Sequence, residues 1–311
     1  MDRPTTESVS PPPAEPSALA RRLIEPEARV ALAELPQHWV TATVEATVPG
    51  HGALVGDLVI LKRIRGAFGR MLMAGASREA LAGKPCPWSP PCALDLLFRE
   101  QARFGKHGIP KPWVLALDRR ALDLVVRITL FGFAVDWAGV AAHALALALR
   151  EHIAWKERAP GLFLPKPEVE RLVIREVDGM LMPRLRASVL LDFVTPLDAA
   201  GDDPLDRPAT VLGRLARRVD LLARWMGVEV DADWHALSQL WNDLAYDTAS
   251  LAREHVQWRT GREHQEFARG LIKGALGIAG DLAPVWPLLV LGQSCHAGRA
   301  ATAGLGRYAL R

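Results

Sequence analysis

The last thirty residues, Leu282–Arg311, read LAPVWPLLVLGQSCHAGRAATAGLGRYALR. An apolar stretch of helical length, Leu282–Gln293, precedes a Cys-His pair, a loop rich in glycine and arginine, and a short final strand, Leu305–Leu310. Glycine has no Cβ, so its backbone can adopt a positive φ and approach a ligand closely, while the arginines add positive charge. This order favours a phosphate-binding loop. An ordinary flexible turn is the alternative, because neither the GxxxxGK[ST] nor the strand-first GxGxxG pattern is present.

The residues before this segment predict the rest of a β-α-β-β-α-β unit. The predicted elements are a strand over Leu185–Val194 that leads into Thr-Pro-Leu, a basic helix over Ala209–Met226, and paired strands over Ala245–Trp258 and Phe267–Ile278. The apolar stretch and the final strand complete the order. A further short helix, Asp231–Trp241, has no place in this scheme.

The first half of the chain predicts the same order. Trp39–Val48, WVTATVEATV, alternates β-branched residues with a period of two, which is typical of a strand, and apolar residues from Leu58 onward recur at the three- and four-residue spacing of a helix face. Two apolar runs that predict a hairpin, a helix and a last strand follow at Trp113–Leu117, Leu122–Phe133, Trp137–His152 and Val169–Val177.

We therefore expect an α+β protein with tandem ferredoxin-like (RRM-like) β-α-β-β-α-β domains and a C-terminal Gly-rich loop. The expected organisation is a disordered or loosely ordered tail over residues 1–36, an N-terminal domain over 37–180 and a C-terminal domain over 181–311. Because this fold supports many functions, it leaves open RNA binding, metal chaperoning and regulation by a small ligand.

Composition narrows the class of protein. A chain of 311 residues of which 50% are apolar can bury the cores of two domains. The apolar stretch near the C-terminus contains two prolines and residues 137–149 are too few to cross a bilayer, so we expect no membrane partner. The N-terminus lacks the basic and apolar regions of a secretion signal.

Cysteine usage points to a reducing compartment. Three cysteines are too few for a disulfide framework, which favours a cytoplasmic location. Five residues separate Cys86 from Cys92 in CPWSPPC, a wider gap than in a zinc knuckle and without a second pair nearby. We expect structural loop cysteines, no metal site and no cofactor.

The distribution of charge favours an anionic partner. The net charge is only +3, but residues 1–60 carry four Lys/Arg against eight Asp/Glu, whereas residues 253–311 carry eight against four. A basic C-terminal region beside a Gly-rich loop suits nucleic acid, although a solvated surface explains the charge alone equally well.

Taken together, four stretches resemble one family, the CRISPR precursor-crRNA processing endoribonucleases of the RAMP (repeat-associated mysterious protein) superfamily. The first half contributes KRIRGAFGRML with the cysteine loop CPWSPPCALDLLF, and VRITLFGFA before an Ala-rich helix. The second half contributes LLDFVTPL with RLARRVDLLARWMG, and LLVLGQSCHAGRAATAGLGRYAL, which is similar to the Gly-rich loop of that family. The resemblance covers residues 39–310. The family often has more cysteines in the insert than this chain does.

The resemblance implies a metal-independent endoribonuclease that binds CRISPR repeat RNA as a hairpin and cleaves the precursor once per repeat. The ribose 2′-OH would attack the adjacent phosphate and leave a 2′,3′-cyclic phosphate, and the protein would stay bound to the crRNA among other subunits of an interference ribonucleoprotein complex. The alternative is a non-catalytic RAMP subunit that only holds guide RNA in such a complex. A third possibility is a small-ligand or metal regulatory domain.

Internal transesterification requires a base, an acid and donors around the phosphorane. His51 lies in the PGHG turn after the first strand, where a family base is commonly found, and His296 is the rival because it lies beside the Gly-rich loop. Lys62 and Arg65 follow on the next helix and can stabilise the phosphorane. A site centred on arginine without histidine is also open, since in-line positioning alone accelerates the reaction.

The residues expected to contact RNA lie in the second half. Arg214, Arg217 and Arg218 share one helix face by their spacing and can follow A-form phosphates, with a solvated face as the alternative. Arg224 lies on the same helix. Further RNA contacts are predicted, for which the alternatives are side chains solvated at the surface or packed in the core. They are Arg259, Arg262, Lys273, Gly298, Arg299, Gly304, Gly306, Arg307 and Tyr308.

Overall fold

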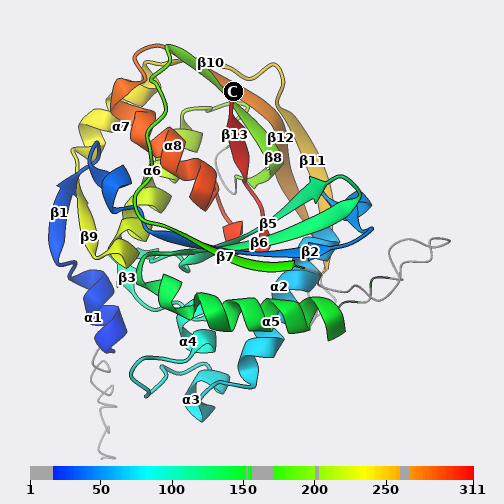
Figure 1. The fold of residues 1–311 in the computed structure, drawn as a ribbon. Coiled ribbons are helices and arrows are strands. Elements are labelled where there is room, and N and C mark those ends of the chain that lie inside the picture. The colour runs from blue at the N-terminus through cyan, green and yellow to red at the C-terminus, as the bar shows by residue number, and fades with distance from the viewer. Residues whose placement is uncertain (1–16, 152, 154, 156–170, 200–202, 260–265) are drawn as a thin grey trace, which may run out of the picture.

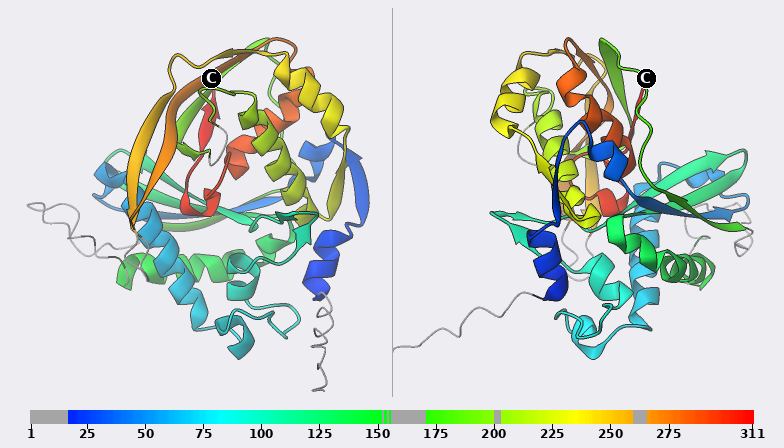
Figure 2. Two further views of the ribbon diagram at one scale, coloured as in Figure 1. Left: turned by 180° about the vertical axis from the view of Figure 1, so that it is seen from behind. Right: turned by 60° about the vertical axis from the view of Figure 1, so that its left-hand side comes forward.

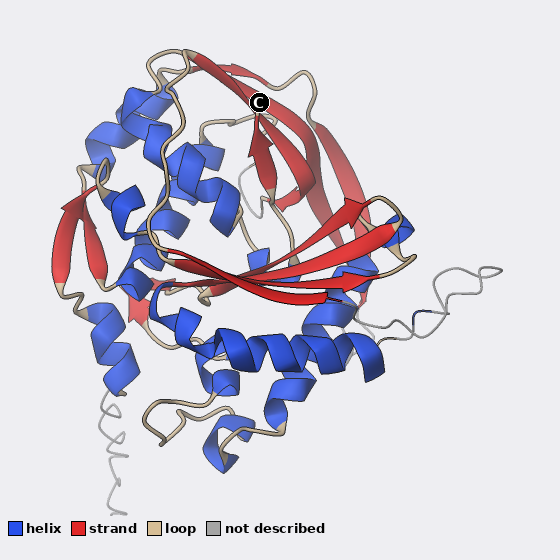
Figure 3. Cartoon of the chain, in the orientation of Figure 1, coloured by secondary structure: helices blue, strands red, loops and turns tan. Residues whose placement is uncertain are grey.

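A computed structural model describes residues 17–311 except 152, 154, 156–170, 200–202 and 260–265. The chain forms two sheets with helices around them, one sheet in each half (Figures 1 and 3). The elements of the first half are α1 (Ala18–Ile24), β1 (Ala28–Ala31), η1 (Leu35–His38), β2 (Thr41–Val48), η2 (Gly52–Leu54), α2 (Leu58–Met73), α3 (Arg78–Leu81), α4 (Ala93–Phe98), β3 (Arg103–Phe104), β4 (His107–Gly108), β5 (Trp113–Arg120), β6 (Asp123–Phe131), η3 (Gly132–Trp137), α5 (Ala138–Glu151) and β7 (Arg171–Val177). Those of the second half are β8 (Ser188–Asp198), α6 (Thr210–Ala223), η5 (Arg224–Met226), β9 (Val228–Asp231), α7 (Trp234–Asn242), β10 (Ala245–Asp247), β11 (Ala252–Arg259), β12 (Glu266–Ala279), η6 (Ala283–Val285), α8 (Trp286–Cys295), η7 (Ala301–Ala303) and β13 (Tyr308–Leu310).

The first sheet has the antiparallel order β5-β6-β2-β7. One face of β2 carries Ala42, Val44, Ala46 and Val48, all fully buried, because alternate residues of a strand point to the same side. Helices α2 and α5 lie against the sheet on this side, as Figure 1 shows. The order is that of a ferredoxin-like unit, in which the second and third strands form a hairpin and the first lies between the third and the fourth.

The second sheet repeats this order as β11-β12-β8-β13, and β10 adds a further pairing along β12. Helices α6 and α8 pack tightly on each other: a Cβ at Gly292 would lie 2.4 Å from Leu215 Cδ1. Both predicted β-α-β-β-α-β units are therefore confirmed. The extra helix expected near residues 231–241 is α7, which follows β9.

The two halves share one core. Trp39 of the first half donates from Nε1 to Ser294 Oγ of α8 at 3.0 Å, and Trp225 of the second half donates to the carbonyl of Pro110 at 2.9 Å. Gly132, with φ of +57°, lies so close to Trp225 that a Cβ would be 1.9 Å from its carbonyl oxygen. The hydrophobic cluster is accordingly continuous from the first half to the second.

The N-terminal segment differs from the predicted tail over residues 1–36. The described part of that range, residues 17–36, contains regular elements: the Ser17 side chain caps α1, and β1 pairs in parallel with β9 of the second half, at the side of the molecule in Figure 2. Arg224, buried to 1% exposure, donates to the carbonyls of Leu23 and Ile24 at the end of α1. The sequence does not reveal β1 as a strand, because its partner β9 lies about 200 residues away.

Helices η3 and α5 are continuous and form one helical segment of 20 residues, Gly132–Glu151. Its length and mean hydropathy of 1.5 are sufficient for a membrane span, unlike the shorter run considered in the sequence. Half of the stretch is buried, in contact with α2 and β2, as in the core helix of a globular protein.

Candidate RNA-binding cavity and catalytic histidine

A cavity of about 460 Å³ lies between the two halves at the exposed side of α6. The residues that line it are His107, Pro110, Thr210, Gly213, Arg214, Arg217, Arg218, Leu221, Gly298 and Arg299. The structure thus brings together five of the residues predicted to contact RNA, from a helix and a loop about 80 residues apart. None of these described lining residues is acidic, so the cavity attracts anions.

Arg218 forms the inner wall of this cavity. Its Nε donates to the carbonyl of Cys295 at the end of α8, whereas its Nη2 is buried and has no hydrogen-bond partner within the described part of the chain. Burial lowers the pKa of Arg218. A buried guanidinium requires an acceptor, because an unpaired charge in the interior is costly, so Arg218 is suited to hold an anion such as a phosphate.

Arg217 and Arg299 are exposed at the mouth of the cavity. The positive charge of Arg217, after burial, is the next cause that lowers the pKa of His107. Arg214 is half-buried on the same helix, and Gly298 has a φ of +73° where a Cβ would lie 2.7 Å from the carbonyl oxygen of Asp198. Glycine at this position therefore lets the loop turn against β8 and leaves Arg299 at the surface.

The rest of the Gly-rich loop lies in the interior, which corrects the expectation that Gly304 and Gly306 contact RNA. Gly304 has a φ of +82°, and a Cβ would lie 2.5 Å from Leu61 Cδ2 of α2. Gly306 has a φ of +71°, and a Cβ would lie 1.8 Å from the carbonyl oxygen of Ala297. Both are buried. These glycines are required because the loop packs against its own helix end and against the first half.

Arg307 and Tyr308 also differ from their predicted role. Arg307 donates from Nη1 to Asp118 Oδ1 at 2.8 Å and to the Leu117 carbonyl at 3.1 Å, so it joins the loop to the first sheet. Tyr308 is 2% exposed and its hydroxyl donates to the carbonyl of Leu289 at 2.6 Å. The alternative reading of Tyr308, core packing, is the one observed.

The other predicted contacts lie outside the cavity. Arg224 is a structural residue, since it holds the end of α1. Lys273 is exposed on β12 and forms an ion pair with Glu254 at 3.5 Å. Arg259 belongs to β11, without a described side chain, and Arg262 lies outside the described residues.

His51 is buried, with 1% exposure, in the turn between β2 and α2. The turn is fixed to the β5–β6 hairpin by a hydrogen bond from the Gly52 amide to the Leu122 carbonyl at 2.8 Å. His51 Nδ1 lies 2.6 Å from the carbonyl of Pro49. Because a carbonyl only accepts, Nδ1 carries the proton, and Nε2 is left as the basic nitrogen.

His51 Nε2 is buried without a hydrogen-bond partner in the described residues. The ring of Trp155 stands edge-on to the imidazole, with 4.8 Å between their centroids. His51 is therefore not a solvent-exposed turn residue. Trp155 covers an imidazole of fixed orientation, and this contact could not be predicted from the sequence because the two residues are about 100 positions apart.

His296 is 2% exposed, and burial, followed by the charges of Arg218 and Arg307, lowers its pKa to about 3. A group with this pKa stays neutral near pH 7 and cannot act as an acid there. Its φ of +64° is unusual for a residue with a Cβ and ends α8 sharply. His296 therefore belongs to the structural end of α8, in the wall behind the cavity, and not to a solvent-facing site.

Lys62 and Arg65 are half-buried on α2, and burial lowers the pKa of each. Arg65 is not in an ion pair with a described acid. Its Nε donates to Thr302 Oγ1 of the Gly-rich loop at 3.4 Å, and its guanidinium lies over the ring of Phe98, 5.5 Å from the centroid. Arg65 thus contacts the loop that packs against both halves.

Known proteins resemble this chain in sequence and in fold. Residues 191–308 match the family model of the CRISPR-associated endoribonuclease Cas6. A product complex of Thermus thermophilus Cas6 is similar in fold, with a TM-score of 0.52, 17% identity and coverage of 88% of this chain and 100% of that chain. A second Cas6 product complex gives a TM-score of 0.50 at 16% identity, over 88% of this chain and 99% of that chain.

The fold is thus similar to that of Cas6 proteins. The predicted resemblance to CRISPR RNA-processing endoribonucleases is confirmed by the Cas6 family model over residues 191–308 and by a similar fold that covers 88% of the chain. A curated tRNA (guanine-N(7)-)-methyltransferase of Leifsonia xyli subsp. xyli is 32% identical over 133 residues, which cover 38% of this chain. The chain spans about half the length of that relative, 52%.

Proposed function

We propose that this chain is an endoribonuclease that binds CRISPR repeat RNA and cleaves precursor crRNA by attack of a 2′-OH, without a metal ion. The observation that carries the proposal is the arginine-lined cavity, in which the buried Nη2 of Arg218 has no acceptor among the described residues. A phosphate of the RNA would supply that acceptor. The Cas6 family match over residues 191–308 covers the helix and loop that form the cavity.

We assign the base to His51. Its Nδ1 is held by Pro49, so that Nε2 is oriented to remove the proton of a ribose 2′-OH. Lys62 and Arg65, on the helix that follows, would offset the charge of the phosphorane. For the ribose to reach Nε2, the ring of Trp155 has to move away from the imidazole.

The contact of the Trp155 ring with the His51 imidazole favours a second candidate function. The second candidate is a RAMP subunit that binds guide RNA and does not cleave it. His51 and His296 are both covered, at 1% and 2% exposure, so neither reaches solvent in this conformation. Such a subunit needs the cavity but no base. In either role the protein would keep its crRNA within an interference complex in the cytoplasm.

Incubation with a repeat RNA in EDTA distinguishes the two candidates. The endoribonuclease makes one cut per repeat with a 2′,3′-cyclic phosphate end, and a 2′-deoxy substitution at the scissile nucleotide abolishes the cut. Tight binding with intact RNA identifies the non-catalytic subunit. Loss of cleavage in EDTA that Mg²⁺ restores would refute the metal-independent mechanism.

A further inference from the structure

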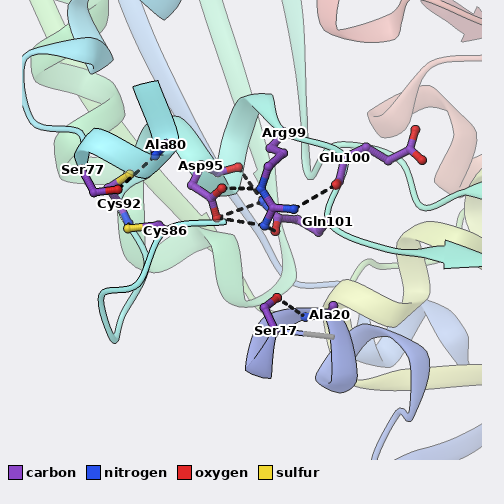
Figure 4. A network of polar contacts seen from close by, with 10 residues as sticks. All are labelled: Ser17, Ala20, Ser77, Ala80, Cys86, Cys92, Asp95, Arg99, Glu100 and Gln101. Atoms are coloured by element: carbon purple, nitrogen blue, oxygen red, sulfur yellow. Dashed lines mark hydrogen bonds and ion pairs between the residues drawn. The ribbon is translucent and has the colours of Figure 1, made fainter. Parts of the chain in front are cut away.

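The sulfur chemistry of the first half is unrelated to the cavity and to His51. Cys86 lies half-buried in the exposed loop between α3 and α4, and Cys92 is buried at the start of α4. The amide of Cys92 donates to Cys86 Sγ at 3.3 Å. Figure 4 shows this contact beside Ser77, whose hydroxyl oxygen accepts from the Ala80 amide at 3.1 Å. Neither cysteine is in a disulfide.

Cys86 has the surroundings of a stabilised thiolate. Burial by itself raises the pKa of Cys86, but hydrogen bonds from the Ser77 hydroxyl, from the amides of Cys92 and Trp88 and from the Cys92 thiol outweigh burial and bring the pKa below its usual value. Donors around a sulfur favour the charged form, which is the nucleophile toward peroxides and disulfides. The half-buried position lets a small oxidant reach Sγ.

Cys92 has the opposite character. Burial is the main cause that raises its pKa, and the neighbouring Cys86 raises it further. Cys92 therefore remains a thiol next to the Cys86 sulfur. One reactive and one sheltered thiol in hydrogen-bond contact make an asymmetric pair, in which a first oxidation product at Cys86 meets a second thiol immediately.

We propose that Cys86 and Cys92 are a peroxide-responsive dithiol, in which Cys86 is oxidised first and Cys92 converts it to a disulfide. In the first step the Cys86 thiolate attacks hydrogen peroxide, the O–O bond breaks, and Cys86 sulfenic acid and hydroxide form. In the second step Cys92 sulfur attacks the sulfenic sulfur, the S–O bond breaks and, with the thiol proton, water leaves. Two thiols are oxidised by two electrons and one peroxide is reduced to two waters.

Oxidation of the two cysteines would affect the surrounding structure through α4. Cys92 is the residue before this helix, and Asp95 on its first turn holds Arg99 and Gln101, as Figure 4 shows. The last residue of the helix, Phe98, is the ring beneath Arg65. A disulfide would fix the loop to the start of α4 without a change in the cavity.

The test uses the full chain, reduced and then exposed to hydrogen peroxide. Cys295 is the internal control, because it is fully buried and burial raises its pKa to about 11. We expect a mass loss of two hydrogens, a Cys86–Cys92 disulfide in the peptide map, and alkylation of Cys86 by iodoacetamide at least tenfold faster than that of Cys295, since reactivity follows thiolate fraction and exposure. Alkylation of Cys86 at the rate of Cys295, or no disulfide under peroxide, would overturn the proposal.

Two variants separate the roles of the thiols. Cys92→Ser should accumulate a sulfenic acid at Cys86 that dimedone captures, whereas Cys86→Ser should give neither the disulfide nor the dimedone adduct. Equal dimedone labelling of both variants contradicts the assignment of Cys86 as the first thiol. The melting temperature of each reduced variant shows whether it is folded, and the alkylation rates in the unsubstituted chain test the proposal even if one variant is not.

Discussion

The turn that holds His51 and the cavity that Arg218 lines differ in what surrounds a buried nitrogen that has no partner among the described residues. Both have a polar nitrogen without a partner in the described chain, but His51 Nε2 is next to the Trp155 ring, whereas Arg218 Nη2 is in the wall of a space of about 460 Å³. His51 Nε2 can accept a proton once it is uncovered, and Arg218 Nη2 can hold an anion once it is exposed to the cavity that Arg218 lines. Under the proposed function, RNA affinity resides in the second half and the base in the first, so we expect that the two can be removed separately.

The largest effect is expected for His51→Ala. Loss of a general base lowers the cleavage rate by about 10²- to 10⁴-fold, whereas RNA affinity is unchanged because the cavity is intact. Single-turnover cleavage and filter binding measure the two quantities. His143→Ala, an exposed histidine of α5, is the control. Since His51 is buried, a melting curve must show that the variant is folded, and full cleavage activity in a folded variant would refute the assignment.

Gly306→Ala should destabilise the loop that connects the two regions. A Cβ would meet the Ala297 carbonyl at 1.8 Å with φ at +71°, so the free energy of unfolding should fall by about 3 kcal/mol. Gly83→Ala, at φ +75° with open space around it, separates the backbone strain, about 1 kcal/mol, from the steric clash. Urea unfolding measures both. Equal losses would mean that the loop shifts freely and is not fixed by packing.

Removal of the two exposed arginines at the cavity should weaken binding without a change in chemistry. For Arg217→Ala combined with Arg299→Ala, we expect about tenfold lower affinity and a salt dependence whose slope falls by roughly 1.5, because two phosphate contacts are lost. The single-turnover rate at saturating RNA should remain. Arg78→Ala, an exposed arginine of α3, is the control. An unchanged salt slope would show that the RNA does not bind at the cavity.

The smallest effect concerns Glu45, whose carboxylate pairs with Arg127 at 3.0 Å and Arg120 at 2.8 Å on the first sheet. Burial raises the pKa of Glu45, but the two arginines outweigh burial and hold the pKa below its usual value. A depressed folded pKa stabilises the protein above the unfolded pKa, and this contribution is lost as pH falls through the folded value. The unfolding free energy should exceed that of Glu45→Gln by about 1 kcal/mol at pH 7, and the difference should vanish as pH falls below the folded pKa. A constant difference across this range would refute the ionic origin.

The order of elements could be predicted from the sequence because it depends on local periodicity. The strand pattern of Trp39–Val48 and the helix face that begins at Leu58 both appear in the structure, as β2 and α2. The same local reasoning placed Arg214, Arg217 and Arg218 on one face, and the structure has all three at the cavity.

Contacts between distant residues could not be predicted in this way. The loop glycines and Arg307 were assigned to RNA because a Gly/Arg pattern does not reveal that Leu61, Leu117 and Asp118 pack on it. His107 and Thr210 at the cavity carried no motif, and only the approach of the two halves shows their position. Residue types indicate which chemistry the side chains can perform. Tertiary packing determines which of these side chains are placed where they can perform it.

The parallel pairing of β1 with β9 has a consequence for synthesis of the protein. β1 leaves the ribosome well before its partner β9, and Arg224, which holds the end of α1, lies 201 positions after Leu23. At 5 to 20 residues per second, the segment that contains α1 and β1 waits roughly 10 to 40 seconds for its partner. The first sheet can form during this interval, so this segment would dock after that sheet although it is made before it.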